Sequence, residues 1–361
     1  MSLSTSNSKN KKSNNWKGYW KNFLITASSC TFFIYLIIIL VDPFDTIFFS
    51  PPLDRAPMAT NQRFSYPAIA RNQKFDSAII GTSSVRLFNP EILNEKFSAN
   101  FVNLAVNSAT PYEQSRFLEY FLRFHPQPKI IIFGIDIKNQ NKWCALDNSE
   151  RFTEREFPEW IFDDNLWNDL LYHFNGKALE IAGRQVAQLT GFMKPRFGLD
   201  GFDNFTPDIS EYDIDKARKN IYGASGKPSQ KERPSNPELS SEEIENLQFP
   251  ALEFFEEMLK SVPEDTTKII HIPPRPWLSQ PVSNTKDYLV LGECRARMIN
   301  IAKGKPNLHI FDFSINSPIT SEDGNFWDEW HHNILIAEKI IEMFSDKILK
   351  NIDNYGYFYY Y

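Results

Sequence analysis

Two short stretches, far apart in the chain, hold the side chains that a serine nucleophile needs. The first is Gly81-Thr-Ser-Ser84, which follows a buried-strand pattern over Ser77 to Ile80. The second is Asp328-Glu-Trp-His331, near the C-terminus. An imidazole can take the hydroxyl proton of a serine while a carboxylate orients the ring. Ser83, His331 and Asp328 therefore form a candidate catalytic set, and their spacing lets the last two project from one loop.

Each stretch also has a simpler interpretation. Ser83 and Ser84 could form a polar turn that caps the next helix, since serine is common at helix N-termini. Asp328 and His331 could be an ordinary pair on a surface loop. His332 is a rival candidate for the base because it is adjacent to His331. The position of the two stretches at opposite ends of one strand–helix pattern favours catalysis.

The elements that would position these residues alternate regularly. Strands are predicted at about 76–81, 100–106, 129–134, 267–272 and 308–313, with helices at about 89–97, 111–124, 250–261, 286–303 and 333–350. Alternation of this kind predicts an α/β fold, with a parallel sheet covered by helices on both faces. A serine that follows the first strand would then lie at the carboxyl edge of the sheet, where ligands bind.

Other parts of the chain interrupt or precede this pattern. Residues 139–249 are predicted to form a large insertion that is partly helical at about 165–190, with a flexible loop near 222–240. Residues 42–75 contain several prolines and are predicted to be a tether and lead-in on the domain surface. The α/β domain is thus expected over 76–350, and the aromatic tail, 351–361, is assigned to no element.

The N-terminus has the pattern of a membrane anchor. Residues 1–22 are polar and basic, and they are followed by the uncharged apolar segment 23–41. As a helix this segment is about 30 Å long, enough to cross the hydrocarbon layer. The basic flank predicts a cytoplasmic N-terminus and a periplasmic or extracellular main domain on a single-pass protein of the cell membrane. A cleaved signal peptide is the alternative, but the apolar run is long and no small-residue cleavage site follows it.

Composition excludes several classes of protein. The chain has 361 residues, 42% of them hydrophobic, which suffices for one large domain or two small ones. A net charge of −6 without a basic stripe argues against a nucleic-acid partner. No Cys/His spacing suggests a metal site, and no cofactor is expected. Cys30 lies in the apolar segment. Cys144 and Cys294 either pair in an oxidising compartment or are two unrelated buried thiols.

The sequence blocks resemble the SGNH (GDSL-like) hydrolase superfamily, in particular its membrane-anchored branch of polysaccharide O-acetyltransferases and esterases. Gly81-Thr-Ser83 takes the place of the Gly-Asp-Ser block, and Asp328-Glu-Trp-His331 matches the final Asp-x-x-His block. The resemblance covers about 76–138 and 250–350 and implies a flavodoxin-like, three-layer sheet. It also implies that Ser83 is the nucleophile, His331 the base and Asp328 its orienting partner.

The middle blocks of the family match less well. Ser108 stands where the second block has a glycine whose backbone N–H helps to bind the oxyanion. The third block is usually Gly-x-Asn-Asp, but here it is Gly134-Ile-Asp136, and Ile135 has no side-chain donor. Three asparagines are candidates to replace this donor: Asn107, Asn139 and Asn141.

Two further residues are candidates for lining the site. Arg86 could hold a substrate carboxylate, although a solvated side chain is the favoured interpretation. His271 lies at the end of a predicted strand, where ligands of parallel sheets bind. A buried structural role explains His271 equally well.

The resemblance implies acyl-ester chemistry on a cell-surface or secreted polysaccharide, by hydrolysis or by transfer between an acyl donor and a sugar hydroxyl. Two other hypotheses stay open. Because the side chain of Ile135 cannot donate a hydrogen bond, the domain could be an inactive scaffold that binds other envelope or export proteins. A lipid or thioester hydrolase at the bilayer would instead require an apolar groove that faces the membrane.

Overall fold

The computed structural model describes residues 12–361 except Phe48, Pro52, Asp54, 138–142, 148–154, Arg196, Gln230 and Lys231. The chain divides into a smaller unit, Met1–Arg55 with Asp164–Lys194, and a larger unit, Ala56–Asp163 with Pro195–Tyr361. The insertion expected over 139–249 is therefore shared between the two units.

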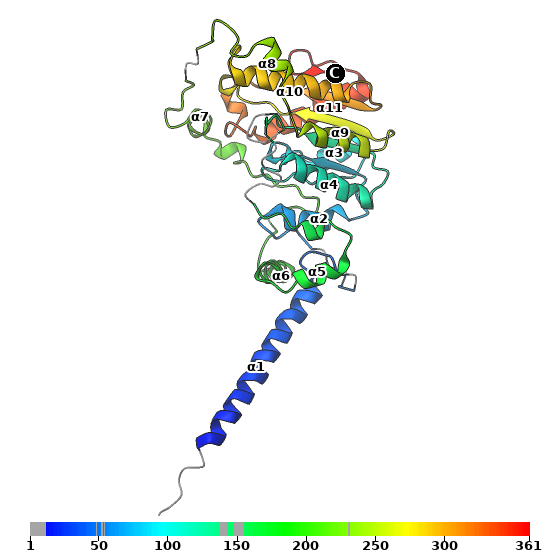
Figure 1. The fold of residues 1–361 in the computed structure, drawn as a ribbon, viewed down its shortest axis with the longest axis vertical. Helices are drawn as coiled ribbons and strands as arrows, with labels where there is room; N and C mark the ends of the chain where they lie inside the picture. The colour runs from blue at the N-terminus through cyan, green and yellow to red at the C-terminus, as the bar shows by residue number, and fades with distance from the viewer. Residues whose placement is uncertain are drawn as a thin grey trace, which may run out of the picture. The chain divides into compact units, whose positions relative to one another are not determined.

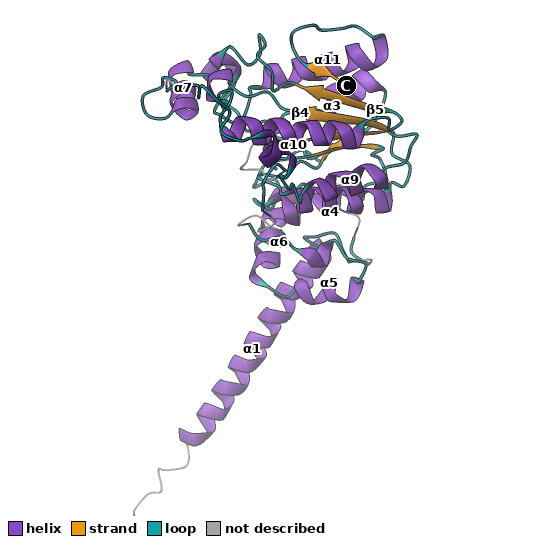
Figure 2. Cartoon of the chain, turned by 45° about the horizontal axis from the view of Figure 1, so that its top comes forward, coloured by secondary structure: helices purple, strands orange, loops and turns teal. Residues whose placement is uncertain are grey.

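The larger unit is built on a six-stranded sheet in the order β2-β1-β3-β4-β5-β6. Figure 2 shows strands of this sheet in orange. The first five strands in sequence run parallel, namely β1 (Ser77–Ile80), β2 (Phe101–Asn103), β3 (Ile130–Gly134), β4 (Thr267–Ile272) and β5 (Leu308–Asp312). All five coincide with predicted strands, so the α/β class with a mostly parallel sheet is confirmed. β1 and β3 are buried at every position, as expected for continuous apolar runs in the middle of a parallel sheet.

Helices cover both faces of this sheet (Figures 1 and 2). On one face α4 (Pro111–Phe124), α9 (Leu252–Ser261) and α10 (Lys286–Ala302) lie side by side, and on the other face α3 (Pro90–Phe97) contacts α11 (Ile334–Lys350). Side-chain oxygens cap the N-termini of four of these helices; the capping residues are Asn89, Thr110, Thr285 and Asn333. The predicted helices therefore begin within about two residues of where the capping patterns place them.

The C-terminal tail, which had no predicted element, forms the last strand of the sheet. β6 (Tyr359–Tyr360) pairs antiparallel with β5. The rings of Phe358 and Tyr360 pack against Phe311, with centroids 5.1 and 5.2 Å away. These aromatic side chains cover an edge that would otherwise expose unpaired backbone groups.

The lead-in is more buried than the sequence suggested. It contains a short helix, α2 (Tyr66–Ala70), and the buried residue Arg63. The Arg63 guanidinium donates to both carboxylate oxygens of Glu113, from Nε at 2.8 Å and from Nη2 at 2.6 Å. A bidentate pair of this kind satisfies two buried charges and joins the lead-in to α4. The larger unit thus begins near Ala56 and not near residue 76.

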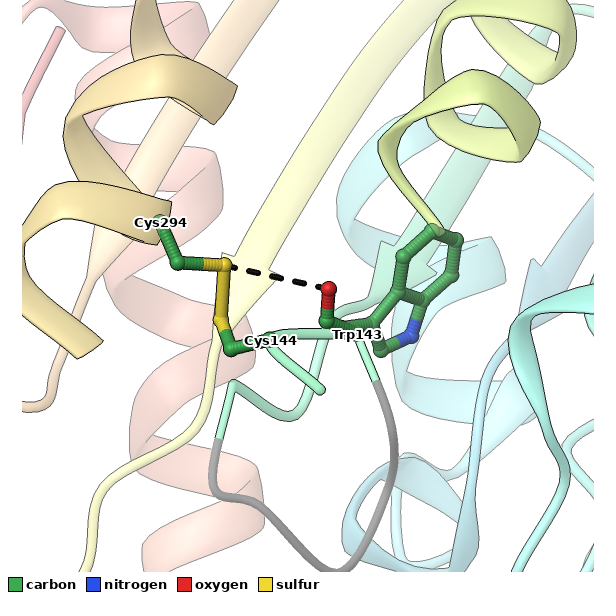
Figure 3. Close-up of a disulfide and its surroundings, with 3 residues drawn as sticks. All are labelled: Trp143, Cys144 and Cys294. Carbon is green, nitrogen blue, oxygen red and sulfur yellow. Dashed lines mark hydrogen bonds between the residues drawn. A yellow bond between two sulfur atoms is a disulfide. The ribbon is translucent and has the colours of Figure 1, made fainter. Parts of the chain in front are cut away.

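A disulfide links two distant parts of the larger unit (Figure 3). Cys144 and Cys294 are joined, although 150 residues separate them in sequence, and both are buried. The pairing interpretation of these two cysteines therefore agrees with the structure. The carbonyl oxygen of Trp143 lies 3.8 Å from the Cys294 sulfur, and the buried Trp143 ring packs on Phe255. The bond thus fastens the chain that follows β3 to α10.

The remaining helices differ in detail from expectation. The region predicted to be partly helical, 165–190, forms two helices of the smaller unit, α5 (Leu166–Tyr172) and α6 (Gly176–Leu189), and Asn175 caps the second. The larger unit also contains α7 (Ile214–Tyr222) and α8 (Ser241–Glu245), and the latter is separate from α9. In the described part of the chain, one helix is long and apolar enough to cross a membrane: Trp16–Val41 of α1 (Lys12–Val41).

Candidate active site

The candidate site lies where the order of the sheet reverses. β1 pairs with β2 on one side and with β3 on the other, and ligands of open α/β sheets bind outside the carboxyl ends of the strands at such a point. Gly81 follows β1 there. A Cβ atom at Gly81 would lie 2.6 Å from a methyl group of Val85 and 3.1 Å from the Cα of Gly134. Glycine therefore allows the tight turn that presents Ser83 at this edge.

The turn is held by the neighbours of Ser83. The Thr82 hydroxyl accepts the backbone N–H of Ser84 at 3.3 Å, and the hydroxyl groups of the two residues lie 3.0 Å apart. Both are buried, whereas Ser83 is half-buried. The simpler interpretation, a capping turn, thus describes Thr82 and Ser84, and it leaves the Ser83 hydroxyl for another partner.

That partner is His331. The Ser83 Oγ lies 2.7 Å from His331 Nε2. The other ring nitrogen, Nδ1, lies 2.8 Å from Oδ2 of Asp328. The three residues therefore form one chain of hydrogen bonds, in the order that acyl transfer by a serine requires.

Asp328 is held as an ionised acceptor. Its Oδ1 accepts the backbone N–H groups of Trp330 at 2.7 Å and His331 at 2.8 Å. Burial alone would raise the pKa of Asp328, but the hydrogen bonds from the His331 ring and from these backbone groups hold it below the usual value. A carboxylate fixed in this way keeps the His331 ring oriented with Nε2 toward Ser83.

Two side chains from other parts of the larger unit brace the loop that carries this pair. Arg275, which follows β4, forms an ion pair with Asp136 after β3 and donates to the carbonyl oxygen of Glu329 at 3.4 Å. Its guanidinium also lies over the ring of Trp330, 4.6 Å from the centroid. On the other side, the Tyr212 hydroxyl donates to the carbonyl oxygen of Phe326 at 2.5 Å. The loop is thus supported from both flanks.

No family model and no curated protein matches this chain.

Arg86 has a different environment from the one expected. It is 3% exposed and forms an ion pair with Asp203, so the solvated interpretation is wrong. Its Nη1 donates to the side-chain oxygen of Asn107 at 2.5 Å, and its guanidinium stacks on Phe205, 4.6 Å from the centroid. Phe205 in turn packs edge-on against the His331 ring at 5.1 Å. Arg86 therefore connects the turn after β1 with Phe205, which packs beside His331.

The candidate oxyanion residues lie at the same edge of the sheet. Although β2 is shorter than predicted, the chain beyond it continues along β1, and the N–H of Val106 donates to the carbonyl oxygen of Gly81 at 3.0 Å. Asn107 and Ser108 follow directly. Ser108 is exposed and has a φ of 53°, the left-handed conformation that glycine adopts most easily. Serine thus takes the backbone geometry expected of a glycine here.

The third predicted block contributes no side-chain donor at position 135. Ile135 is buried, and its backbone N–H donates to the carbonyl oxygen of His271 at 2.9 Å. Asn139 and Asn141 lie outside the described residues. Asn107 is half-buried, and because its oxygen accepts from Arg86, its amide nitrogen is oriented as a donor. In the described residues no hydrogen bond from this nitrogen is found.

The other two histidines near the site are enclosed. His271 is fully buried among the rings of Phe88, Phe313 and Phe344, so it belongs to the core, as its structural interpretation expected. Burial lowers the pKa of His271 well below its usual value. Burial also lowers the pKa of His332 to about 4. His332 is therefore neutral at pH 7, and the structure brings His331, not His332, to Ser83.

A cavity of about 320 Å³ lies beside the site, with Asp136 and Arg275 in its wall. Aromatic and polar side chains also line it, from the segment between β4 and α10, from α10, from the loop after β5 and from the tail; they include Trp277, Gln280, Tyr288, Asn316 and Tyr359. Neither Ser83 nor His331 lines this cavity, but Arg275 in its wall donates to the loop that carries His331. No group of three or more His, Cys, Asp or Glu side chains that could hold a metal ion is found among the described residues.

Sequence reasoning did not identify Asp203, Phe205 or Arg275 as parts of the site. Asp203 and Phe205 lie in an irregular segment. Asp203, which pairs with Arg86, is 117 residues further along the chain. No periodic pattern marks such a segment. Arg275 had a usable signal, because it follows a predicted strand and Pro273-Pro274 at the ligand-binding edge.

Proposed function

We propose that the chain is a membrane-anchored serine acyl-esterase or O-acyltransferase of the SGNH type, acting on a cell-surface or secreted polysaccharide. The observation that carries the proposal is the chain of hydrogen bonds from Asp328 through His331 to Ser83. The strand order β2-β1-β3-β4-β5 supports it, because this is the flavodoxin-like order that the resemblance to SGNH hydrolases implies.

In the first half of the proposed reaction, the Ser83 oxygen attacks the carbonyl carbon of an acyl ester. The Ser83 proton passes to Nε2 of His331, and the imidazolium is stabilised by the ionised Asp328. When the tetrahedral intermediate collapses, the bond to the leaving alcohol breaks and the alcohol takes the proton from His331. An acyl-serine remains.

The oxyanion of the intermediate needs preorganised donors at the same edge of the sheet. The backbone N–H groups of Ser83 and Ser108 are the first two candidates. Support comes from the left-handed conformation of Ser108, which turns the backbone as a glycine would. We assign the third donor to the amide nitrogen of Asn107, because Arg86 occupies the amide oxygen and so fixes the orientation of the group.

In the second half, a hydroxyl group takes the acyl group from Ser83. His331 removes the proton from a water molecule in an esterase, or from a sugar hydroxyl in a transferase. The tetrahedral intermediate then collapses and returns the proton from His331 to the Ser83 oxygen. The same residues serve both outcomes, so the acceptor decides between hydrolysis and transfer.

The proposed location rests on three features. α1 has the length and composition of a membrane-spanning helix, and the basic residues before its apolar segment favour a cytoplasmic N-terminus. The disulfide between Cys144 and Cys294 is of the kind that persists in oxidising compartments. A single-pass protein with its larger unit outside the cytoplasm agrees with the apolar helix, the basic N-terminal residues and the disulfide.

The test uses the full chain in detergent micelles with p-nitrophenyl acetate as substrate. We expect turnover that is lost in Ser83→Ala and retained in Ser84→Ala, since the Ser84 hydroxyl contacts Thr82 and not His331. Mass spectrometry of the quenched reaction should find the acetyl group on the peptide that contains Ser83. Equal turnover in the wild type and in Ser83→Ala would contradict the proposal.

A second candidate function is an inactive scaffold in an envelope or polysaccharide-export assembly. The observation that favours it is Ile135, whose side chain cannot donate to an oxyanion. This candidate predicts no acetyl-Ser83 with p-nitrophenyl acetate, either alone or with an acetylated polysaccharide and an unacetylated acceptor, although the protein is folded. Retention of a polysaccharide or of an envelope protein by that inactive chain would then support it.

A further inference from the structure

The smaller unit exposes large apolar side chains on the segment 166–193, which we call the α5–α6 hairpin. Trp167 and Leu171 are 81% and 72% exposed, and their spacing of four residues places them on the same face of α5. Phe192, just after α6, is 89% exposed. Large apolar side chains that gather on an exposed surface often mark contact with another protein or with a membrane.

Phe192 is exposed by a defined turn. Gly191 has a φ of 80°, and the backbone N–H groups of Phe192 and Met193 donate to the carbonyl oxygen of Ala187 at 2.8 and 3.0 Å. These bonds fold the chain back over the last turn of α6, as in common glycine-containing helix C-caps. This turn therefore leaves the Phe192 ring exposed and outside the core of the smaller unit.

The hairpin lies beside the end of α1, within the same unit (Figures 1 and 2). α6 contacts α1, and Phe174, between α5 and α6, packs against Tyr35 of α1 at 4.6 Å. Ile38 and Val41 of α1 are buried in this unit, whereas Phe32 and Phe33 are exposed. The apolar surface of α1 therefore continues into the surface of the hairpin.

The first charge after α1 is withdrawn from the surface at this level. The buried Asp42 carboxylate accepts the backbone N–H groups of Thr46 and Ile47 and the hydroxyl of Ser50. Nε2 of His173, the residue after α5, lies 3.1 Å from the same carboxylate. An Asp satisfied in this way can sit at the boundary of a hydrocarbon layer without exposing its charge.

The length of α1 gives the depth of the hairpin. A hydrocarbon layer of about 30 Å takes about 20 helical residues, so a span that begins at Phe23 ends near Asp42. The turns of α1 that α6 covers then lie at the outer boundary of that layer. Exposed aromatic and leucine side chains at this depth are typical of helices that lie in a membrane interface.

We propose that the α5–α6 hairpin is an interfacial membrane anchor, which inserts Trp167, Leu171 and Phe192 between the lipid headgroups and acyl chains of the leaflet where α1 ends. The partner is the lipid surface. The proposal rests on the membrane-spanning role proposed for α1. It adds a second contact that fixes how the smaller unit meets the bilayer, which a single helix would leave free to rotate and tilt.

The experiment places an environment-sensitive fluorophore at single cysteines of the full chain in phosphatidylcholine nanodiscs, with and without lipids that carry a nitroxide on the acyl chain. The native Cys30 reports on α1, since the other two cysteines are paired. In a Cys30→Ser background, Trp167→Cys, Leu171→Cys and Phe192→Cys report on the hairpin. Glu180→Cys is the matched control, because Glu180 is an exposed residue of α6 that forms ion pairs with Lys177 and Arg184.

We expect the three hairpin labels to lose about half of their fluorescence or more to the nitroxide lipids, as for side chains at the acyl boundary, and Glu180 to lose much less. Quenching of Cys30 without quenching of the hairpin labels would overturn the inference and leave the anchor role of α1 intact. An unquenched Cys30 would overturn both. Hairpin labels that are shielded from water but not quenched by the nitroxide lipids would also overturn the proposed lipid contact. They would indicate a protein partner instead.

Discussion

The Ser83 hydroxyl oxygen lies 2.7 Å from Nε2 of His331, although 248 residues separate the two in sequence. Two independent constraints produce this contact. A tight turn after β1 presents Ser83 at the point where the sheet order reverses, and the loop before α11 presents His331 at the same edge. Asp328, in the same loop, orients the His331 ring through its contact with Nδ1. The hydrogen bonds from Asp328 through His331 to Ser83 are the observation on which the proposed catalytic function rests.

Asp328→Asn should lower the rate of acyl-enzyme formation by about 10²–10⁴-fold with little loss of stability. Oδ1 of Asp328 receives two backbone N–H groups, so the oxygen of an asparagine will remain there. Its NH₂ group then faces Nδ1 of His331 and favours the tautomer with the proton on Nε2. That tautomer cannot accept the Ser83 proton.

The measurement is single-turnover acetylation of Ser83 by p-nitrophenyl acetate, with the denaturant midpoint recorded for each variant. Glu322→Gln is the control, because it changes an exposed carboxylate in the segment before α11 whose side chain does not cap the short helical turn that follows it. An Asp328→Asn protein as fast as the wild type would show that this hydrogen bond does not orient the base.

Much of this arrangement could be predicted because it is local. Asp328 and His331 share one loop, and Ser83 follows a continuous apolar run, so residue spacing was sufficient to identify them. The environment of Arg86 could not be predicted in the same way. Its partner Asp203 is remote and lies in a segment without periodicity, and an arginine after a short turn is usually solvated. The strand at Tyr359–Tyr360 was missed for a similar reason, since two residues show no alternation.

The lead-in and the insertion show the limits of composition as a guide. Prolines and irregular spacing predicted a surface segment, but Arg63 is buried there because Glu113 of α4 neutralises it. Within the insertion, Asn175 caps the second of two helices in the region predicted to be partly helical, and the α5–α6 hairpin joins α1 in the smaller unit. Such pairings depend on contacts between distant residues and not on local pattern.

Asn107 gives the second prediction, because two variants separate its two hydrogen-bonding roles. Asn107→Asp keeps an oxygen that accepts from Arg86 but loses the amide donor. Asn107→Ala loses both. If the amide nitrogen binds the oxyanion, both variants will lower kcat by about 10²–10³-fold with a smaller effect on KM. The measurement is steady-state turnover of p-nitrophenyl acetate. A fully active Asn107→Asp would show that only the contact with Arg86 matters.

The disulfide gives the third prediction. Replacing both Cys144 and Cys294 by serine should lower the Tm of the larger unit by about 5–15 °C, because the bond restricts the unfolded chain across a long loop. Differential scanning fluorimetry of the full chain in micelles measures this change. A reductant should lower the wild-type Tm toward that of the double variant and leave the double variant unchanged.

Cys30→Ser is the matched control for the disulfide, since Cys30 is exposed and unpaired in the described structure. Its Tm should equal that of the wild type. If the double variant melts at the wild-type temperature, the link between the chain after β3 and α10 does not contribute to stability.

His332 gives the last prediction, which concerns stability at mildly acidic pH. Burial lowers its pKa to about 4 in the folded chain, whereas an unfolded histidine titrates near pH 6.5. Between these values the unfolded chain binds a proton that the folded chain does not, so stability falls as the pH falls through this window. For His332 alone the loss between pH 7 and pH 5 is about 2 kcal/mol. Buried His271 adds to it in the same direction.

His332→Gln should therefore show a shallower decrease in the free energy of unfolding between pH 7 and pH 5 than the wild type, whatever its absolute stability. Urea denaturation of the full chain in micelles, followed by tryptophan fluorescence, measures both slopes. Leu349→Gln, at an exposed site on α11, tests whether a glutamine alone changes the slope. Asp328 does not confuse the result, because its lowered pKa places its own effect below this window. Identical slopes in His332→Gln and the wild type would mean that folding does not lower the pKa of His332.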